Sequence, residues 1–142
     1  MTRATSTLDR LDPTSTRGLR VLLVEDSDTV RRAVALGLRS LGFEVTAVLG
    51  GEDALAVYSA IQPEVIITDL SMPGMDGFEL IATLRMRGLD VPILLITARD
   101  SAHDRAAAVA AGADEYLLKP FGLATLSTTV TTLAEKHAMV HG

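Results

Sequence analysis

The chain has 142 residues, 48% of them hydrophobic, and carries a formal net charge of −5 at pH 7. This length fits one domain and this apolar content supports a sizeable core, so intrinsic disorder is excluded for most of the sequence. No apolar run approaches the roughly 18 residues of a membrane-spanning helix, and the negative charge disfavours general attraction to nucleic acid or membrane. The absence of cysteine excludes disulfides, thiolate metal sites and cysteine nucleophiles.

The two ends of the chain differ in composition from its middle. Residues 1–18 mix Thr, Ser, Arg, Asp and Pro with isolated Leu, and we expect a flexible N-terminal tail there. They lack the apolar segment of a secretory signal, so we expect a cytoplasmic protein. One domain is predicted over residues 19–135, followed by a short C-terminal tail at 136–142.

Between the tails, short β-branched runs alternate with segments of helical periodicity, which is typical of repeated βα units around a parallel sheet. The predicted strands are residues 19–24, 44–48, 65–68, 93–97 and 115–118. The first helix is expected after the N-cap Ser27 and before Gly42, and the second between the turn at Gly50 and Gly51 and the break at Pro63. Three further helices are expected near 78–86, 102–111 and 123–135.

The favoured right-handed crossovers make this pattern a doubly wound, five-stranded parallel sheet with five helices. Ligands of such sheets bind at the carboxyl ends of the strands. Polar residues follow the predicted strands at these ends, namely Glu25, Asp26, Asp28, Asp69, Thr97 and Lys119. We therefore expect a functional site at this edge.

Carboxylates are the first component of that site. With the strand order 2-1-3-4-5, strands one and three are neighbours, so Glu25 and Asp26 should converge on Asp69. Three carboxylates in one pocket repel each other, and a hard divalent cation with oxygen ligands relieves the repulsion, which predicts magnesium. The alternative is that Glu25 and Asp26 only cap the helix that follows them.

A cation and a hydroxyl complete the set. Lys119 beside three carboxylates and a metal ion is explained if an anion is held there, and the Thr97 hydroxyl can donate to a phosphoryl oxygen. Taken singly, Thr97 can be an ordinary strand residue and Lys119 a solvated turn residue. Together they predict a phosphoryl site.

Four stretches carry a resemblance to a known family. They are Val-Glu-Asp-Ser at 24–27, Asp-Leu-Ser-Met-Pro-Gly-Met-Asp-Gly at 69–77, Ile-Thr-Ala at 96–98 and Tyr-Leu-Leu-Lys-Pro-Phe at 116–121. In this order and spacing the chain resembles a response-regulator receiver domain of two-component signalling. The resemblance implies a flavodoxin-like three-layer sandwich.

The resemblance also implies roles for the acidic residues. Asp69 is the implied phosphoacceptor, Asp26 a direct magnesium ligand and Glu25 an acid that orients metal-bound water. The main-chain carbonyl of Ser71 would complete the protein ligands.

Further roles follow from the same resemblance. Thr97 and Tyr116 resemble the pair that switches rotamer on phosphorylation, and Lys119 resembles the lysine that pairs with the phosphoryl group. The Lys119–Pro120 peptide bond is expected to be cis.

The implied function is that of a phosphoryl acceptor in a two-component system or phosphorelay. Its donor would be a phosphohistidine of a histidine kinase or a histidine phosphotransfer protein, in a magnesium-dependent step. The output would be a changed face of the fourth helix, fifth strand and fifth helix, which meets an unknown protein. Such a chain is not an enzyme with a separate substrate, because it catalyses only its own phosphorylation and dephosphorylation.

Several expectations concern surfaces. The partner histidine domain would pack on the first helix, where Ser27, Asp28, Arg31 and Ala35 are expected to face it. No direct contact with nucleic acid or membrane is expected. The chain is expected to be mainly monomeric, because Thr125 and Thr129 stand where receivers of winged-helix regulators carry dimer-forming charges.

Two other functions compete with this interpretation. One is a magnesium-dependent aspartyl phosphatase with Asp26 as nucleophile and Asp28 as its second aspartate, which would leave Asp69 unexplained. The other is a receiver-like scaffold that is never phosphorylated. The chain length leaves no room for an output domain, so we expect either a stand-alone receiver or part of a longer protein.

Overall fold

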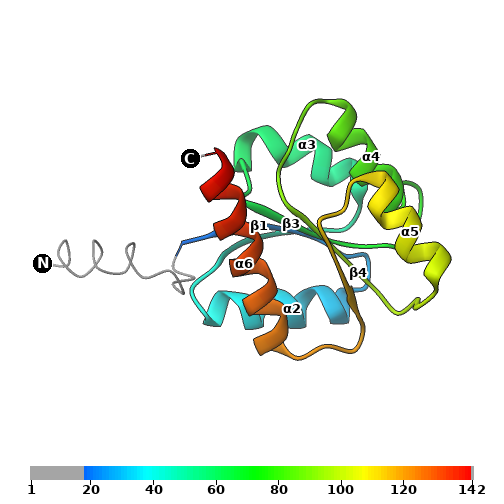
Figure 1. Ribbon diagram of the computed structural model, residues 1–142. Helices are drawn as coiled ribbons and strands as arrows, with labels where there is room; N and C mark the ends of the chain where they lie inside the picture. The colour runs from blue at the N-terminus through cyan, green and yellow to red at the C-terminus, as the bar shows by residue number, and fades with distance from the viewer. Residues whose placement is uncertain (1–17, 142) are drawn as a thin grey trace, which may run out of the picture.

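The computed structural model describes residues 18–141, so the predicted N-terminal tail, apart from Gly18, lies outside the described residues (Figure 1). Strands and helices alternate along this part of the chain. In order they are β1 (Arg20–Val24), α2 (Asp28–Ser40), β2 (Glu44–Val48), α3 (Gly51–Ile61), β3 (Val65–Asp69), α4 (Gly77–Met86), β4 (Ile93–Thr97), α5 (Ala102–Ala111), β5 (Glu115–Leu118) and α6 (Leu123–His141).

The strands form one parallel sheet in the order β2-β1-β3-β4-β5, which confirms the predicted topology. Figure 1 shows α2 and α6 on one face of the sheet and α3, α4 and α5 on the other. The register pairs Val24 with Thr68 and Asp69 with Ile96, so the carboxyl ends of β1, β3 and β4 are aligned. Residues that follow these strands therefore meet at one edge.

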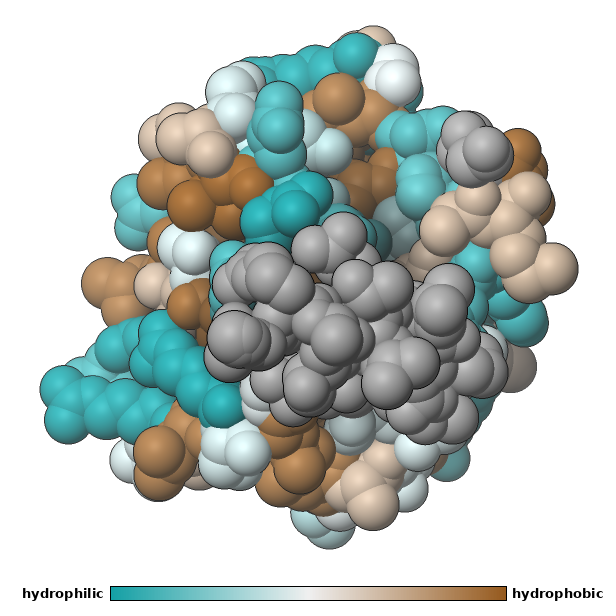
Figure 2. All heavy atoms as spheres, turned by 90° about the vertical axis from the view of Figure 1, so that its left-hand side faces the viewer, coloured by the Kyte–Doolittle hydropathy of each residue, from teal (hydrophilic) through white to brown (hydrophobic). Residues whose placement is uncertain are grey.

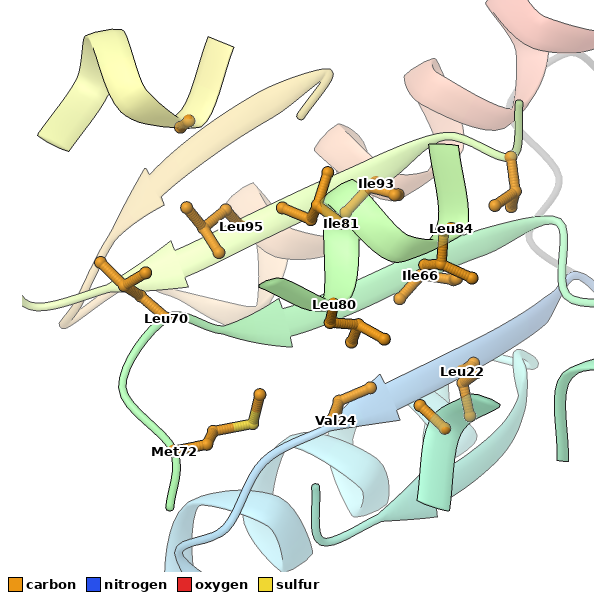
Figure 3. Close-up of a cluster of buried hydrophobic side chains, with 13 residues drawn as sticks. Leu22, Val24, Ile66, Leu70, Met72, Leu80, Ile81, Leu84, Ile93 and Leu95 are labelled. Carbon is orange, nitrogen blue, oxygen red and sulfur yellow. The ribbon is translucent and has the colours of Figure 1, made fainter. Parts of the chain in front are cut away.

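Two apolar layers hold the helices against the sheet, because successive strand residues point to opposite faces. Figure 3 shows Leu80, Ile81 and Leu84 of α4 packed towards side chains of the strands that include Leu22 and Ile66. On the opposite face, the buried cluster draws on β1, β3, β4, α2 and α6. All five residues of β3 and of β4 are buried, as expected for central parallel strands covered on both sides.

The connection from β3 to α4 is folded back tightly against the sheet. Asp76 is the N-cap of α4 and forms a capping box with Glu79. A Cβ on Gly77 would stand 2.5 Å from the carbonyl oxygen of Asp69 and 2.9 Å from the Cα of Leu70. Only glycine lets α4 begin this close to Asp69.

The last helix is longer than the sequence indicated. α6 continues to His141, whereas its periodicity predicted an end near Glu135. Residues 136–141 contain neither glycine nor proline, so nothing in them breaks the helix. The domain limits of 19–135 remain a prediction.

The outer surface of the described residues mixes polarities. Figure 2 views the molecule from the left-hand side of Figure 1, where α6 ends, and shows hydrophobic and hydrophilic residues interleaved around the grey atoms. None of the helices in residues 18–141 combines the length and the apolar character that crossing a bilayer requires.

Candidate functional site

The loop from β1 to α2 supplies the first two acidic side chains. Glu25 is 1% exposed and its Oε2 accepts a hydrogen bond from the main-chain N–H of Ser27, whereas Asp26 is exposed. Ser27 caps α2, because its hydroxyl accepts from the main-chain N–H of Val30 at 3.3 Å. Since Ser27 is the N-cap, capping does not account for Glu25 and Asp26.

The third acidic side chain comes from the end of β3. Asp69 is 7% exposed, and its Oδ1 accepts from the main-chain N–H of Leu70 at 2.8 Å. Carboxylate oxygens of Glu25, Asp26 and Asp69 lie within 4.8 Å of one another. The convergence expected from the topology is thus observed, and carboxylate oxygens are the ligands that a hard divalent cation such as magnesium prefers.

Lys119 lies between two of these carboxylates. Its Nζ is 3.1 Å from Oε1 of Glu25 and 3.3 Å from Oδ2 of Asp69. The main-chain N–H of Lys119 donates to the carbonyl of Thr97 at 2.8 Å, which fixes the lysine beside the end of β4. The Lys119–Pro120 bond is cis, as expected.

The charges of this site influence one another. Burial raises the pKa of Glu25, and the negative charge of Asp69 adds to the increase, against hydrogen bonds from Ser27 and Lys119. Burial alone would lower the pKa of Lys119, but the hydrogen bond to Glu25 and the charge of Asp69 outweigh it and raise that pKa. Lys119 is therefore held in its charged form between Glu25 and Asp69.

Of the two residues expected to act as a switch, Thr97 is the last residue of β4 and Tyr116 lies within β5. Thr97 is 2% exposed, and its Oγ1 accepts from the main-chain N–H of Arg99 at 3.0 Å. The half-buried Tyr116 donates its hydroxyl hydrogen to the main-chain carbonyl of Arg99. The guanidinium of Arg105 stacks on the Tyr116 ring, 4.6 Å from its centroid.

Some expected residues lie elsewhere or have other contacts. Ser71 is exposed in the loop after β3, and its role as a carbonyl ligand stays a prediction. Asp28 is outside the acidic cluster and pairs with Arg31, so the aspartate pair of the phosphatase alternative is not assembled.

The expected docking surface on the first helix needs correction at two positions. Ala35 is only 3% exposed and packs in the core, because its position on α2 faces the sheet. Arg31 turns inward, with its side chain 13% exposed and its Nη1 donating to the main-chain carbonyl of Glu25 at 3.1 Å. Arg31 therefore supports the acidic loop.

The sequence reasoning also missed a contact network next to Thr97. Arg99 forms a two-pronged ion pair with Asp104, a carboxylate that is 6% exposed. The spacing of Ser101 and Asp104 matches a helix N-terminal capping pattern, and α5 begins at Ala102, where the sequence predicted it. No local signal predicts that Arg99 reaches Asp104.

Comparison with known proteins gives one family. Residues 21–131 match the response regulator receiver domain. The transcriptional regulatory protein PrrA of Mycobacterium tuberculosis is 41% identical over 117 residues, which are 82% of this chain and 50% of PrrA. The transcriptional regulatory protein QseB of Haemophilus influenzae is 33% identical over 123 residues, which are 87% of this chain and 56% of QseB. The chain thus spans about half the length of these curated relatives.

Solved structures give the same fold. The chemotaxis protein CheY4 of Vibrio cholerae superposes with a TM-score of 0.78 at 36% identity, covering 82% of this chain and 98% of that one. The receiver domain of the Francisella response regulator 1452 gives a TM-score of 0.80 at 27% identity, and the match covers 84% of this chain and 99% of that one.

Proposed function

The chain belongs to the response regulator receiver domain family, and we propose that Asp69 accepts a phosphoryl group from a phosphohistidine. The observation that carries the proposal is the position of the Lys119 ammonium between Glu25 and Asp69, beside a third carboxylate. An ammonium at this point is placed to pair with a phosphoryl group on Asp69. Receiver domains interact with histidine kinases and are typically not enzymes in the strict sense.

In the proposed reaction, a carboxylate oxygen of Asp69 attacks phosphorus in line. A phosphorus–oxygen bond forms, the phosphorus–nitrogen bond to the donor histidine breaks, and the imidazole nitrogen leaves with the electron pair. The ammonium of Lys119 and the hydroxyl of Thr97 face the charge on the transferred oxygens, so this chain mainly positions and stabilises. The Leu70 N–H holds Oδ1 of Asp69 and fixes the carboxylate plane during the attack.

The residues present fit a magnesium ion. Glu25, Asp26 and Asp69 would hold it, with the main-chain carbonyl of Ser71 as the further proposed ligand. A bound magnesium ion would neutralise phosphoryl oxygens and the excess carboxylate charge.

We propose that the acyl phosphate product changes the neighbouring surface. The phosphoryl group adds about 1.5 to 2 negative charges next to Thr97, which attracts its hydroxyl and alters the space available to the Tyr116 ring. The face formed by α5, β5 and α6 is the proposed output surface, and its partner is a protein. The donor is a histidine kinase or a histidine phosphotransfer protein.

The test is phosphorylation by a small phosphodonor in the presence of magnesium, followed by intact-mass measurement. The wild type should gain one phosphoryl group that hydroxylamine removes, and EDTA should prevent the gain. Asp69→Asn should not be modified, whereas Asp76→Asn, which keeps a capping oxygen on α4, should react normally. Stoichiometric modification of Asp69→Asn would refute the assignment.

A further inference from the structure

One residue outside the proposed chemistry touches both members of the proposed switch. The main-chain N–H of Arg99 donates to Oγ1 of Thr97 at 3.0 Å, and the carbonyl of Arg99 accepts from the hydroxyl of Tyr116. These two contacts use both polar groups of a single residue's main chain. The position of Arg99 therefore affects both side chains at once.

The side chain of Arg99 is anchored in α5. Its Nη2 lies 2.8 Å from Oδ1 of Asp104 and its Nε lies 3.1 Å from Oδ2, a fork that fixes the guanidinium plane. The hydroxyl of Ser101 also donates to Oδ2 of Asp104 at 2.9 Å and accepts from the Asp104 main-chain N–H at 3.0 Å. Asp104 is thus a nearly buried carboxylate whose donors all come from its own loop and helix start.

The charge state of Asp104 is consistent with an anchor. The hydrogen bond from Ser101 lowers its pKa and the contact with Arg99 adds to this effect, against the contribution of burial. Asp104 therefore remains ionised at neutral pH, as the ion pair with Arg99 requires.

We propose that Asp104 is a positioning residue for phosphoryl transfer, which acts through Arg99 to orient the hydroxyl of Thr97. The inference rests on the proposed function of Asp69. Because the Arg99 N–H engages one lone pair of Thr97 Oγ1, the hydroxyl hydrogen points elsewhere and can donate to a phosphoryl oxygen. Without its anchor in α5, the Arg99 peptide can move away and the hydroxyl loses this constraint.

The first test measures the rate of phosphorylation by a small phosphodonor, which needs no partner protein. Asp104→Asn removes the carboxylate charge and should slow the reaction about threefold to tenfold, the range expected for one weakened hydrogen bond in the transition state. Arg99→Ala should slow it similarly. Because Arg99 has a side chain that is 54% exposed, this variant is expected to fold even if Asp104→Asn does not.

A double-mutant cycle separates positioning from a general structural effect. In a Thr97→Ala background, adding Arg99→Ala or Asp104→Asn should change the rate by less than about 1.5-fold, because the hydroxyl on which they act is gone. Arg99→Lys, which keeps the charge but loses the fork, should fall between the wild type and Arg99→Ala. Asp100→Asn is the matched control, because Asp100 is exposed on the same loop and pairs with Arg105.

Two results would overturn the inference. One is an unchanged rate for Arg99→Ala, and the other is equal slowing by Arg99→Ala with and without Thr97. Both leave the proposed function intact if Asp69→Asn still fails to react. Modification of Asp69→Asn would instead refute the proposed function itself.

Discussion

Glu25 and Lys119 are 94 positions apart in the sequence, yet Oε1 of Glu25 and Nζ of Lys119 lie 3.1 Å apart. Glu25 follows β1 and Lys119 follows β5, and the strands β3 and β4 separate these two in the sheet. The lysine therefore reaches across the carboxyl edge of the sheet to a carboxylate that is 1% exposed. Because the pair lies in a poorly solvated place, its charges affect the stability of the fold as well as the chemistry.

The raised pKa of Glu25 predicts a pH-dependent stability. Because the folded state holds the Glu25 proton more tightly than the unfolded state, the stability that Glu25 contributes is largest below its ordinary pKa of 4.5. It declines as the pH rises through the raised folded value. In the presence of EDTA, the free energy of unfolding of wild type relative to Glu25→Gln should fall from about pH 4.5 upwards, as measured by urea denaturation. Parallel pH profiles for the two proteins would contradict the prediction.

Magnesium should stabilise the fold by relieving repulsion among the carboxylates. At ten times the dissociation constant, binding to the folded state alone adds about 1.4 kcal/mol to the free energy of unfolding. Asp26→Asn should lose most of this gain, whereas Glu44→Gln, at the amino end of β2 on the opposite edge of the sheet, should keep it. Thermal denaturation with magnesium and with EDTA makes the measurement. A magnesium gain retained in Asp26→Asn would show that the ion binds elsewhere.

Gly77→Ala should damage both the fold and the site. The new methyl group would overlap main-chain atoms of Asp69 and Leu70. Main-chain atoms cannot move aside as the end of a flexible side chain can. We expect a loss of about 3 kcal/mol in the free energy of unfolding, at the upper end of overpacking effects, together with slower phosphorylation. Gly122→Ala is the matched control, since nothing lies within 4 Å of its Cβ, and it should cost no more than about 1 kcal/mol. Similar urea midpoints for the two variants would refute the role of the close approach.

The chain is predicted to remain mainly monomeric at micromolar concentration, even with magnesium and beryllofluoride. Arg105 is already engaged with Asp100 at 3.2 Å and with the Tyr116 ring, and Asp114 pairs with Arg85 at 2.9 Å. Exposed ion pairs contribute only about 0.2–1 kcal/mol each, so exchanging these contacts for pairs between subunits gains little. Sedimentation velocity provides the measurement. A tight two-fold dimer through α5, β5 and α6 would contradict the prediction.

The convergence of Glu25, Asp26 and Asp69 could be predicted because it depends on topology alone. A residue directly after a parallel strand must lie at the carboxyl edge, and right-handed crossovers leave few possible strand orders. The same reasoning located Lys119 and Thr97. The cap residues Ser27 and Asp76 could be predicted too, because capping depends on contacts only three residues apart.

Contacts between loops could not be predicted in this way. The ion pair between Arg99 and Asp104 depends on the path of a loop that has no periodicity. The contact of Arg31 with the Glu25 carbonyl depends on how α2 is rotated on the sheet, and that rotation also buried Ala35, which was expected on the surface. The end of α6 was missed because a helix without a breaking residue stops where its surroundings, and not its own sequence, cease to favour it.

The sequence by itself determined the alternation of strands and helices, the parallel sheet and the edge at which the charged residues gather. Apolar periodicity is a local property of the sequence, and it shows where each strand and helix begins and ends. Right-handed crossovers then place the ends of these parallel strands at one edge of the sheet. Only the tertiary structure decided which atoms meet, such as Lys119 with both Glu25 and Asp69, and Arg99 with Thr97, Tyr116 and Asp104. Such contacts require particular side-chain rotamers and loop paths, and these are selected by packing among segments that are distant in the sequence.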